Sequence, residues 1–165
     1  MSKFLFVLVF LFPLFLSAQR FPGYFSVEGG GNGIVGSVNF GKPIIIHPNY
    51  TVNFQWGIGW SSKSAQAKTP INFPIQIVSK FGKENFFFEA GVGSSLIFQS
   101  TLNRSENEKP TNELYLSPIV GFRKETKKWF WRVYACPLFH VSGEKTTDNL
   151  TSDFVKFGIG VGIIL

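Results

Sequence analysis

The segment Phe139–Glu144 holds the residues whose types and spacing come nearest to a catalytic arrangement. His140 and Ser142 lie two positions apart, and Glu144 follows. A histidine beside a serine, with an acid nearby, has the residue types that form a nucleophilic triad. Residues two apart share one face of a strand, so the spacing predicts that His140 and Ser142 lie together. Glu144 comes too soon after the serine, and we interpret His140 as a rim histidine in a polar interior.

Other candidates for chemistry are weaker. His47 is far from His140 in the sequence and gives no metal site with it. Cys136 is the single cysteine, which excludes an internal disulfide framework, and we interpret it as a packed thiol. Gly29–Gly33 is glycine-rich but has no Lys-Ser/Thr and no following helix, so it is no phosphate loop. We therefore predict no catalytic, metal-binding or cofactor-binding residue and no enzymatic activity.

The elements that position these residues are revealed by alternation of period two, which is clearest over Asp153–Leu165. A strand places successive side chains on opposite faces. One face of this segment is apolar throughout, whereas the other is mostly glycine or polar. The apolar residues are Val155, Phe157, Ile159, Val161, Ile163 and Leu165. A strand that is apolar outside and small or polar inside is the repeating element of a transmembrane β-barrel.

Similar alternation recurs along the chain and predicts one all-β domain, an eight-stranded antiparallel up-and-down transmembrane barrel. An even number of strands places both termini on the periplasmic side. Pro74, Pro118 and Pro137 fall inside strands, where each removes a hydrogen-bond donor and indicates a bulge or a bend. The predicted strands are Tyr24–Gly30, Ile34–Phe40, Tyr50–Ser61, Pro70–Phe81, Phe86–Phe98, Glu113–Arg123, Trp129–Val141 and Asp153–Leu165.

The connections between these strands fit that topology. Asn32-Gly33 is a strong hairpin signal, so Gly29–Gly33 is interpreted as a hairpin tip. Gly41–Asn49 is expected to be a periplasmic turn, although a long one. Two other connections are short, as periplasmic turns are, and two are long and polar, as outer loops are. These are Gly82–Asn85 and Glu125–Lys128, and Ser100–Thr111 and Ser142–Ser152, respectively.

Residues 1–18 are predicted to be a cleaved signal peptide. Lys3 supplies the positive charge, and the apolar run Phe4–Leu16 is too short for a membrane helix. The small residues Ser17 and Ala18 indicate cleavage after Ala18, and an uncleaved N-terminal anchor is the alternative. The mature domain, residues 19–165, is then exported, and we expect it in the outer membrane.

The glycines decide which face of the barrel is outside. A soluble eight-stranded barrel, such as a lipocalin, also alternates but turns its apolar face inward. Gly158, Gly160 and Gly162 would only weaken a strand on a wet outer face, whereas inside a narrow barrel they leave room for long side chains. The apolar face also carries more aromatic bulk than an eight-stranded interior could hold. Both arguments favour the membrane barrel.

The inner face then carries charged residues that must be compensated. Unpaired buried charges are strongly unfavourable, so acids and bases are predicted to pair in a network that plugs the lumen. Eight strands enclose only enough space for side chains, which favours a solid barrel over an open channel. The predicted members of this network are Glu28, Lys80, Glu89, Glu113, Arg123, Arg132 and Lys156.

Four features carry a family resemblance: Val27–Gly33 followed by Ser37–Phe40, then Phe87–Gly93, Ile119–Arg123, and the terminal glycine alternation. Together they resemble the small outer membrane β-barrel domain proteins of Bacteroidota-type bacteria, which have an OmpA/OmpX-like architecture. The resemblance implies outer-membrane lipid and the barrel-insertion machinery as partners, but no particular activity. Such barrels usually end in an aromatic residue, whereas this chain ends Ile164-Leu165.

The leading functional hypothesis is a monomeric, non-enzymatic barrel that is structural or presents its outer loops to an extracellular partner. Basic residues alternate with acidic ones, so the net charge of +6 forms no nucleic-acid patch. A narrow transport pore is one alternative. The other is a lipid A deacylase-like hydrolase, because those small barrels also carry a His-x-Ser motif. The chain resembles them only in His140-Val141-Ser142, and the predicted register turns His140 toward the lumen.

Overall fold

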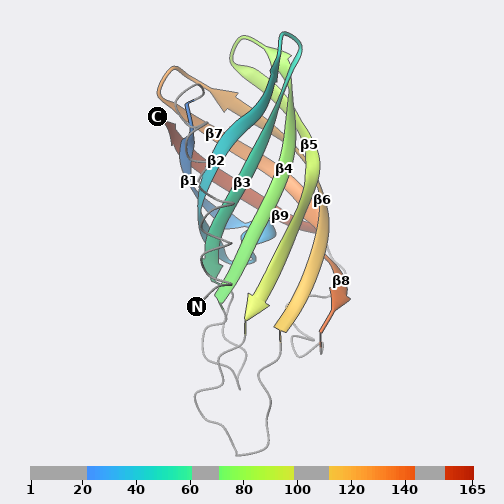
Figure 1. Cartoon of the computed structure of the whole chain (residues 1–165). Coiled ribbons are helices and arrows are strands. Elements are labelled where there is room, and N and C mark those ends of the chain that lie inside the picture. Colours follow the sequence, from blue (N-terminus) through green and yellow to red (C-terminus); the bar gives the residue numbers. More distant parts are fainter. Residues whose placement is uncertain (1–21, 61–70, 99–111, 144–154) are drawn as a thin grey trace, which may run out of the picture.

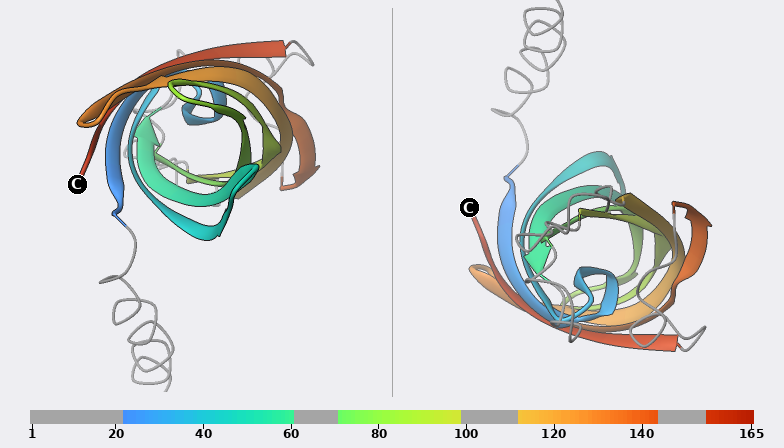
Figure 2. Two further views of the ribbon diagram at one scale, coloured as in Figure 1. Left: turned by 90° about the horizontal axis from the view of Figure 1, so that it is seen from above. Right: turned by 90° about the horizontal axis from the view of Figure 1, so that it is seen from below.

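The computed structural model describes residues 22–60, 71–98, 112–143 and 155–165, so the predicted signal peptide lies outside the described residues. The described strands form one closed antiparallel barrel (Figures 1 and 2). Each strand pairs with its neighbour, and β1 pairs with β9 to close the sheet. The strands are β1 Tyr24–Gly30, β2 Gly36–His47, β3 Tyr50–Trp60, β4 Ile71–Lys83, β5 Phe86–Phe98, β6 Asn112–Glu125, β7 Trp129–Pro137, β8 Phe139–Ser142 and β9 Val155–Ile164.

Strand β8 continues β7 beyond Leu138, so the two occupy one position in the wall and the predicted eight-stranded barrel is confirmed. The break follows from prolines. Pairing of β6 with β7 reaches Val120 opposite Ala135 and resumes with β8 at Leu116 opposite Phe139. Pro118 and Pro137 lie between these pairs, and neither can donate a ladder hydrogen bond.

Pro74 interrupts only one of its two ladders. On the β3 side, pairing stops at Ile75 and resumes at Asn72, whereas Pro74 pairs regularly with Ser95 of β5. The register shifts among the described strands lie elsewhere, between Pro43 and Ile45 and between Leu114 and Tyr115. Pro74, Pro118 and Pro137 therefore mark gaps in the ladder rather than bulges.

The connection between β2 and β3 corrects the prediction of a turn over residues 41–49. Strand β2 continues to His47, and only Pro48 and Asn49 join it to β3. The register shift leaves Ile44 as an extra residue, which is a β-bulge. A bulge interrupts the two-residue alternation, so the apolar run Ile44-Ile45-Ile46 does not show the pattern of a strand.

The apolar face points out of the barrel. On β9, Phe157 and Ile159 are 76% and 61% exposed, whereas the intervening Gly158 is buried. Gln55 and Gln76 of the facing strands are buried in the lumen. The lipocalin-like alternative, with an apolar interior and a polar exterior, is therefore wrong. Within the described ranges, no helix has the length and apolarity needed to span a bilayer.

Candidate functional site

Arg132 of β7 is the centre of a charged cluster in the lumen. Its Nη1 lies 3.4 Å from Glu28 Oε1 of β1, and its Nε lies 3.2 Å from Glu89 Oε2 of β5. The Nε contact lacks hydrogen-bond alignment and acts as a charge contact. Arg132 also donates hydrogen bonds to Gln55 Oε1 of β3 at 3.1 Å and to Gln76 Oε1 of β4 at 3.2 Å. One guanidinium thus joins four other strands.

Arg123 of β6 extends the cluster toward the short turns. Its Nη1 lies 3.7 Å from Glu89 Oε1, and its Nε lies 2.7 Å from Glu125 Oε1. Lys80 donates a 2.7 Å hydrogen bond to the same Glu125 oxygen. The Lys80 and Glu125 side chains are 11% and 16% exposed, so the cluster meets solvent at this end.

Charge is balanced in this lumen cluster, which among the described residues holds Arg132, Arg123 and Lys80 against Glu28, Glu89 and Glu125. Burying these ions is costly, and their mutual attraction offsets the cost only when the geometry and the additional hydrogen bonds are good. Neutral groups supply those bonds.

Glu28 shows how the neutral groups complete the cluster. Its Oε1 accepts a 2.9 Å hydrogen bond from Gln55 Nε2, and its Oε2 accepts one of the same length from the Tyr134 hydroxyl. The Tyr24 hydroxyl in turn donates to Gln55 Oε1 at 3.1 Å. Both oxygens of this fully buried carboxylate are therefore satisfied.

The connection between β1 and β2 folds into the barrel, which corrects the interpretation of residues 29–33 as a hairpin tip. Gly31–Gly33 form a short 3-10 helix, η2, whose residues are all buried, and the blue segment lies inside the ring in Figure 2. Gly30 and Gly31 have φ angles of 70° and 61°. This backbone needs glycine, and a side chain at Gly31 would collide with the Tyr134 hydroxyl.

Asn32 attaches this inward loop to the walls. Its side-chain amide donates to the Ser94 carbonyl at 3.1 Å and accepts from the Ser117 hydroxyl at 3.1 Å. Its backbone N–H donates to the Tyr134 hydroxyl at 3.3 Å, and its carbonyl accepts from the Asn72 amide at 3.4 Å. Since Tyr134 also binds Glu28, the loop and the lumen cluster share a hydrogen-bonding group.

An apolar cluster lies beside the inward loop, toward the strand ends from which the longer connections leave. Ile34 packs there with Ile97, Tyr115 and Leu138, all of them buried. Ile34 has a φ of 67°, a backbone conformation that is strained for a β-branched residue. The burial of its side chain helps to offset that strain.

Replacing Asn32 with alanine is expected to destabilise the barrel by about 1–3 kcal/mol, because it removes several buried hydrogen bonds that are each worth about 0.5–1.5 kcal/mol. Urea unfolding of the refolded protein in detergent measures this change. Asn49→Ala is the matched control, since Asn49 is exposed in the β2–β3 turn and should alter stability by less than about 0.5 kcal/mol. Equal losses in the two variants would contradict the role of Asn32.

Two residues predicted for the network lie apart from the cluster. Glu113 is buried near the other end of the lumen, where its Oε2 accepts a 2.6 Å hydrogen bond from the Tyr115 hydroxyl. Lys156 is half-buried opposite Cys136, and no ion pair among the described residues includes it. The sequence analysis missed Glu125, which it placed in a turn, although Glu125 continues the alternation two residues after Arg123.

His140 and Ser142 do not lie on one face as predicted. The register shift in β8 places His140 opposite Tyr115, a lumen residue, and Ser142 opposite Leu114, which belongs to the outer face. The His140 ring instead contacts the Tyr115 ring edge-on, with 5.2 Å between centroids. Glu144 lies outside the described residues. In the part of the chain that is described, no group of three His, Cys, Asp or Glu side chains could hold a metal ion.

Comparison with known proteins identifies the fold. No protein-family model and no curated protein matches the sequence. The N-terminal β-barrel domain of Pseudomonas aeruginosa OprF superposes with a TM-score of 0.55 at 11% identity, covering 87% of this chain and 97% of that chain. Ail, the attachment invasion locus protein of Yersinia pestis, gives 0.51 at 7% identity, covering 88% and 97%. These likenesses establish the fold alone: the chain is an all-β, eight-stranded antiparallel closed barrel similar to these two proteins.

Proposed function

We propose that this protein is a non-enzymatic barrel of the Gram-negative outer membrane with a closed lumen. The observation that carries the proposal is the combination of an apolar exterior with a charged, internally paired interior. Water solvates the exterior of a soluble barrel, whereas here the groups that need solvation are enclosed and the apolar groups are presented outward.

Aromatic residues near both ends of the barrel support membrane insertion. Near the short turns, the Tyr50 and Phe81 rings contact each other with 6.2 Å between centroids. Near the opposite end, Phe73 and Phe98 form a T-shaped pair at 5.5 Å. Aromatic girdles at the two interfaces of the bilayer are typical of outer-membrane barrels.

Two successive obstructions support a closed lumen. Arg132 and its partners fill the part nearer the short turns, and Asn32 with the Ile34 cluster fills the part nearer the long connections. An ion crossing the barrel would have to displace both sets of contacts. A solid barrel is therefore favoured over the narrow-pore alternative.

Folding the mature chain into lipid vesicles and then into planar bilayers tests this proposal. We expect the unboiled protein to migrate differently from the boiled protein on a gel, and we expect no discrete conductance steps. A porin of known conductance is the positive control. Identical mobility would contradict the inserted barrel, whereas conductance steps in a heat-modifiable sample would contradict the closed lumen alone.

We propose a structural role or a role in surface contact for this barrel. Loops on a rigid scaffold commonly carry recognition, so an extracellular partner would bind residues 100–111 and 142–152. Apart from Ser142 and Gly143, these loops lie outside the described residues. We expect the barrel-insertion machinery to deliver the chain as a monomer. Lipid A mass spectra that are unchanged by His140→Ala would agree with the absence of hydrolase activity.

A further inference from the structure

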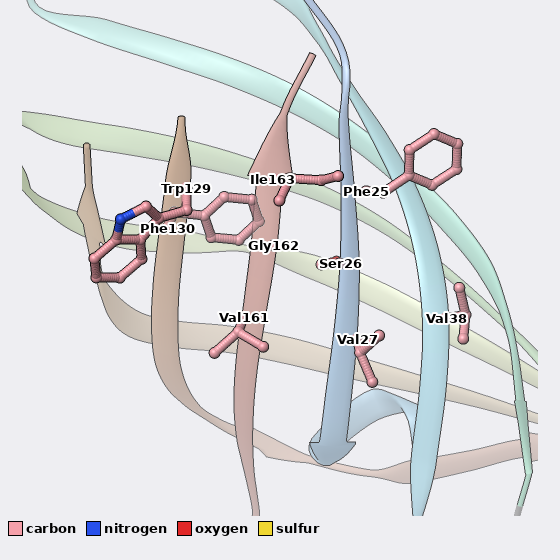
Figure 3. A pocket seen from close by; sticks show the side chains of 9 residues that line it. All are labelled: Phe25, Ser26, Val27, Val38, Trp129, Phe130, Val161, Gly162 and Ile163. Atoms are coloured by element: carbon pink, nitrogen blue, oxygen red, sulfur yellow. The ribbon is translucent and has the colours of Figure 1, made fainter. Parts of the chain in front are cut away.

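A groove of about 420 Å³ crosses the outer wall over β2, β1, β9 and β7 (Figure 3). The surface that lines it is almost wholly carbon. It extends from Trp129, the first residue after the β6–β7 turn, to Val27, the middle residue of β1. The groove therefore lies near the end of the barrel that carries the short turns. The outward side chains around it are Phe25, Val27, Val38, Trp129, Val161 and Ile163.

Positive charge lies where the groove meets the turn. Lys127 and Lys128 directly precede Trp129, and both are exposed. The Lys128 carbonyl accepts a 2.9 Å hydrogen bond from the N–H of Ile164, the residue after Ile163 of the groove. Neither lysine belongs to an ion pair among the residues that the structure describes. An apolar channel with two free cations at its mouth fits an amphiphile that has an anionic head and a long apolar tail.

We infer that this groove holds an acyl chain of an anionic phospholipid from the periplasmic leaflet, with the phosphate at Lys127 and Lys128. The inference rests on the proposed function, because only an inserted barrel presents the groove to lipid and its short turns to the periplasm. The groove lies at the end with the short turns, which is the periplasmic end of an inserted barrel, so its occupant would come from the periplasmic leaflet. Trp129 at its mouth lies at the depth where tryptophan contacts lipid head groups.

Native mass spectrometry of the folded mature chain tests the inference. The protein is released from nanodiscs that contain phosphatidylglycerol and phosphatidylcholine in equal amounts, with identical acyl chains. A lysine near an anionic surface strengthens attraction about fivefold. We therefore expect retained phosphatidylglycerol to exceed retained phosphatidylcholine by at least about fivefold.

Two pairs of variants separate the groove from the rest of the lipid-facing wall. Val161→Phe fills the groove, and Val92→Phe is its control on β5, since these valines are 58% and 61% exposed. Lys128→Gln removes a charge at the mouth, and Lys83→Gln removes one beside the β4–β5 turn. We expect Val161→Phe to abolish retention of either lipid, Lys128→Gln to lower the preference about fivefold, and both controls to behave as the unchanged protein.

Each outcome has one interpretation. Absence of heat-modifiable mobility in the unchanged protein would overturn the proposed function itself. Heat-modifiable protein that retains both lipids equally would overturn only this inference, as would equal effects of Lys128→Gln and Lys83→Gln. A protein dimer that is free of lipid and is disrupted by Val161→Phe would assign the groove to a second copy of the chain and would also overturn it. If Val161→Phe fails to fold, the lysine pair still decides.

Discussion

Replacing Arg132 with methionine is expected to destabilise the barrel by about 3–5 kcal/mol, the usual cost of removing one partner from a buried ion pair. Arg132 is 1% exposed and is the cation that contacts Glu28. Without it, that buried carboxylate has no ion-pair partner among the described residues, and Gln55 and Gln76 each lose a hydrogen-bond donor.

Urea unfolding followed by tryptophan fluorescence measures this loss, and a second substitution identifies its origin. Adding Glu28→Gln to Arg132→Met removes the stranded charge, so the double variant should regain about half of the lost stability. Lys124→Met is the control, because it removes a cation from the outer face rather than from the lumen. Lys124 is half-buried there and lies over the Phe86 ring. A double variant that is less stable than the single one would show that the charge of Glu28 is not the cause.

Replacing Ile159 with arginine is expected to cost about 2–4 kcal/mol, because a charge would then face the middle of the hydrocarbon layer. Ile159 is 61% exposed on the wall of β9, between the buried Gly158 and Gly160. On a surface wetted by water the same substitution would change stability by less than about 0.5 kcal/mol.

A second isoleucine tests whether the cost of an arginine depends on its depth in the membrane. Ile45 lies near the β2–β3 turn and is 50% exposed, and in the proposed inserted barrel an arginine there would be close to the interface. There the cost should fall to about 0–1 kcal/mol. Unfolding in lipid vesicles compares the two, and equal small losses would show that the outer wall does not contact hydrocarbon.

Most strands of this barrel could be predicted because apolar and polar residues alternate along a strand that has one apolar and one polar face. The bounds of β1 at Tyr24 and Gly30, and of β5 at Phe86 and Phe98, agree with the alternation. Strand β2 was too short in the prediction, since the bulge at Ile44 interrupts the period and three isoleucines follow one another.

The sequence predicted which residues face the lumen, but it did not predict their positions along the barrel axis. Glu89, Glu113 and Lys156 each belong to the polar side of a strand, yet only Glu89 reaches Arg132. Height in a barrel depends on strand tilt and on the stagger between neighbouring strands, and neither is visible in a local pattern.

The inward loop could not be predicted, for a different reason. The glycines around Asn32 permit either direction of the chain, outward or inward. Its side-chain partners Ser95, Ser117 and Tyr134 are single polar residues on β5, β6 and β7. Each resembles any other lumen residue, so only the assembled barrel reveals the site.

The distribution of the contacts of Arg132 over the wall has a consequence for the order of assembly. Its partners come from β1, β3, β4 and β5, and none lies on an adjacent strand. No single hairpin can form these contacts, and the full set is complete only when β1, β3, β4, β5 and β7 have come together in one barrel. Interactions that form after the rate-limiting barrier slow unfolding without speeding folding. If the contacts of Arg132 form late, we expect this residue to slow unfolding of the finished barrel more than it changes the rate of folding.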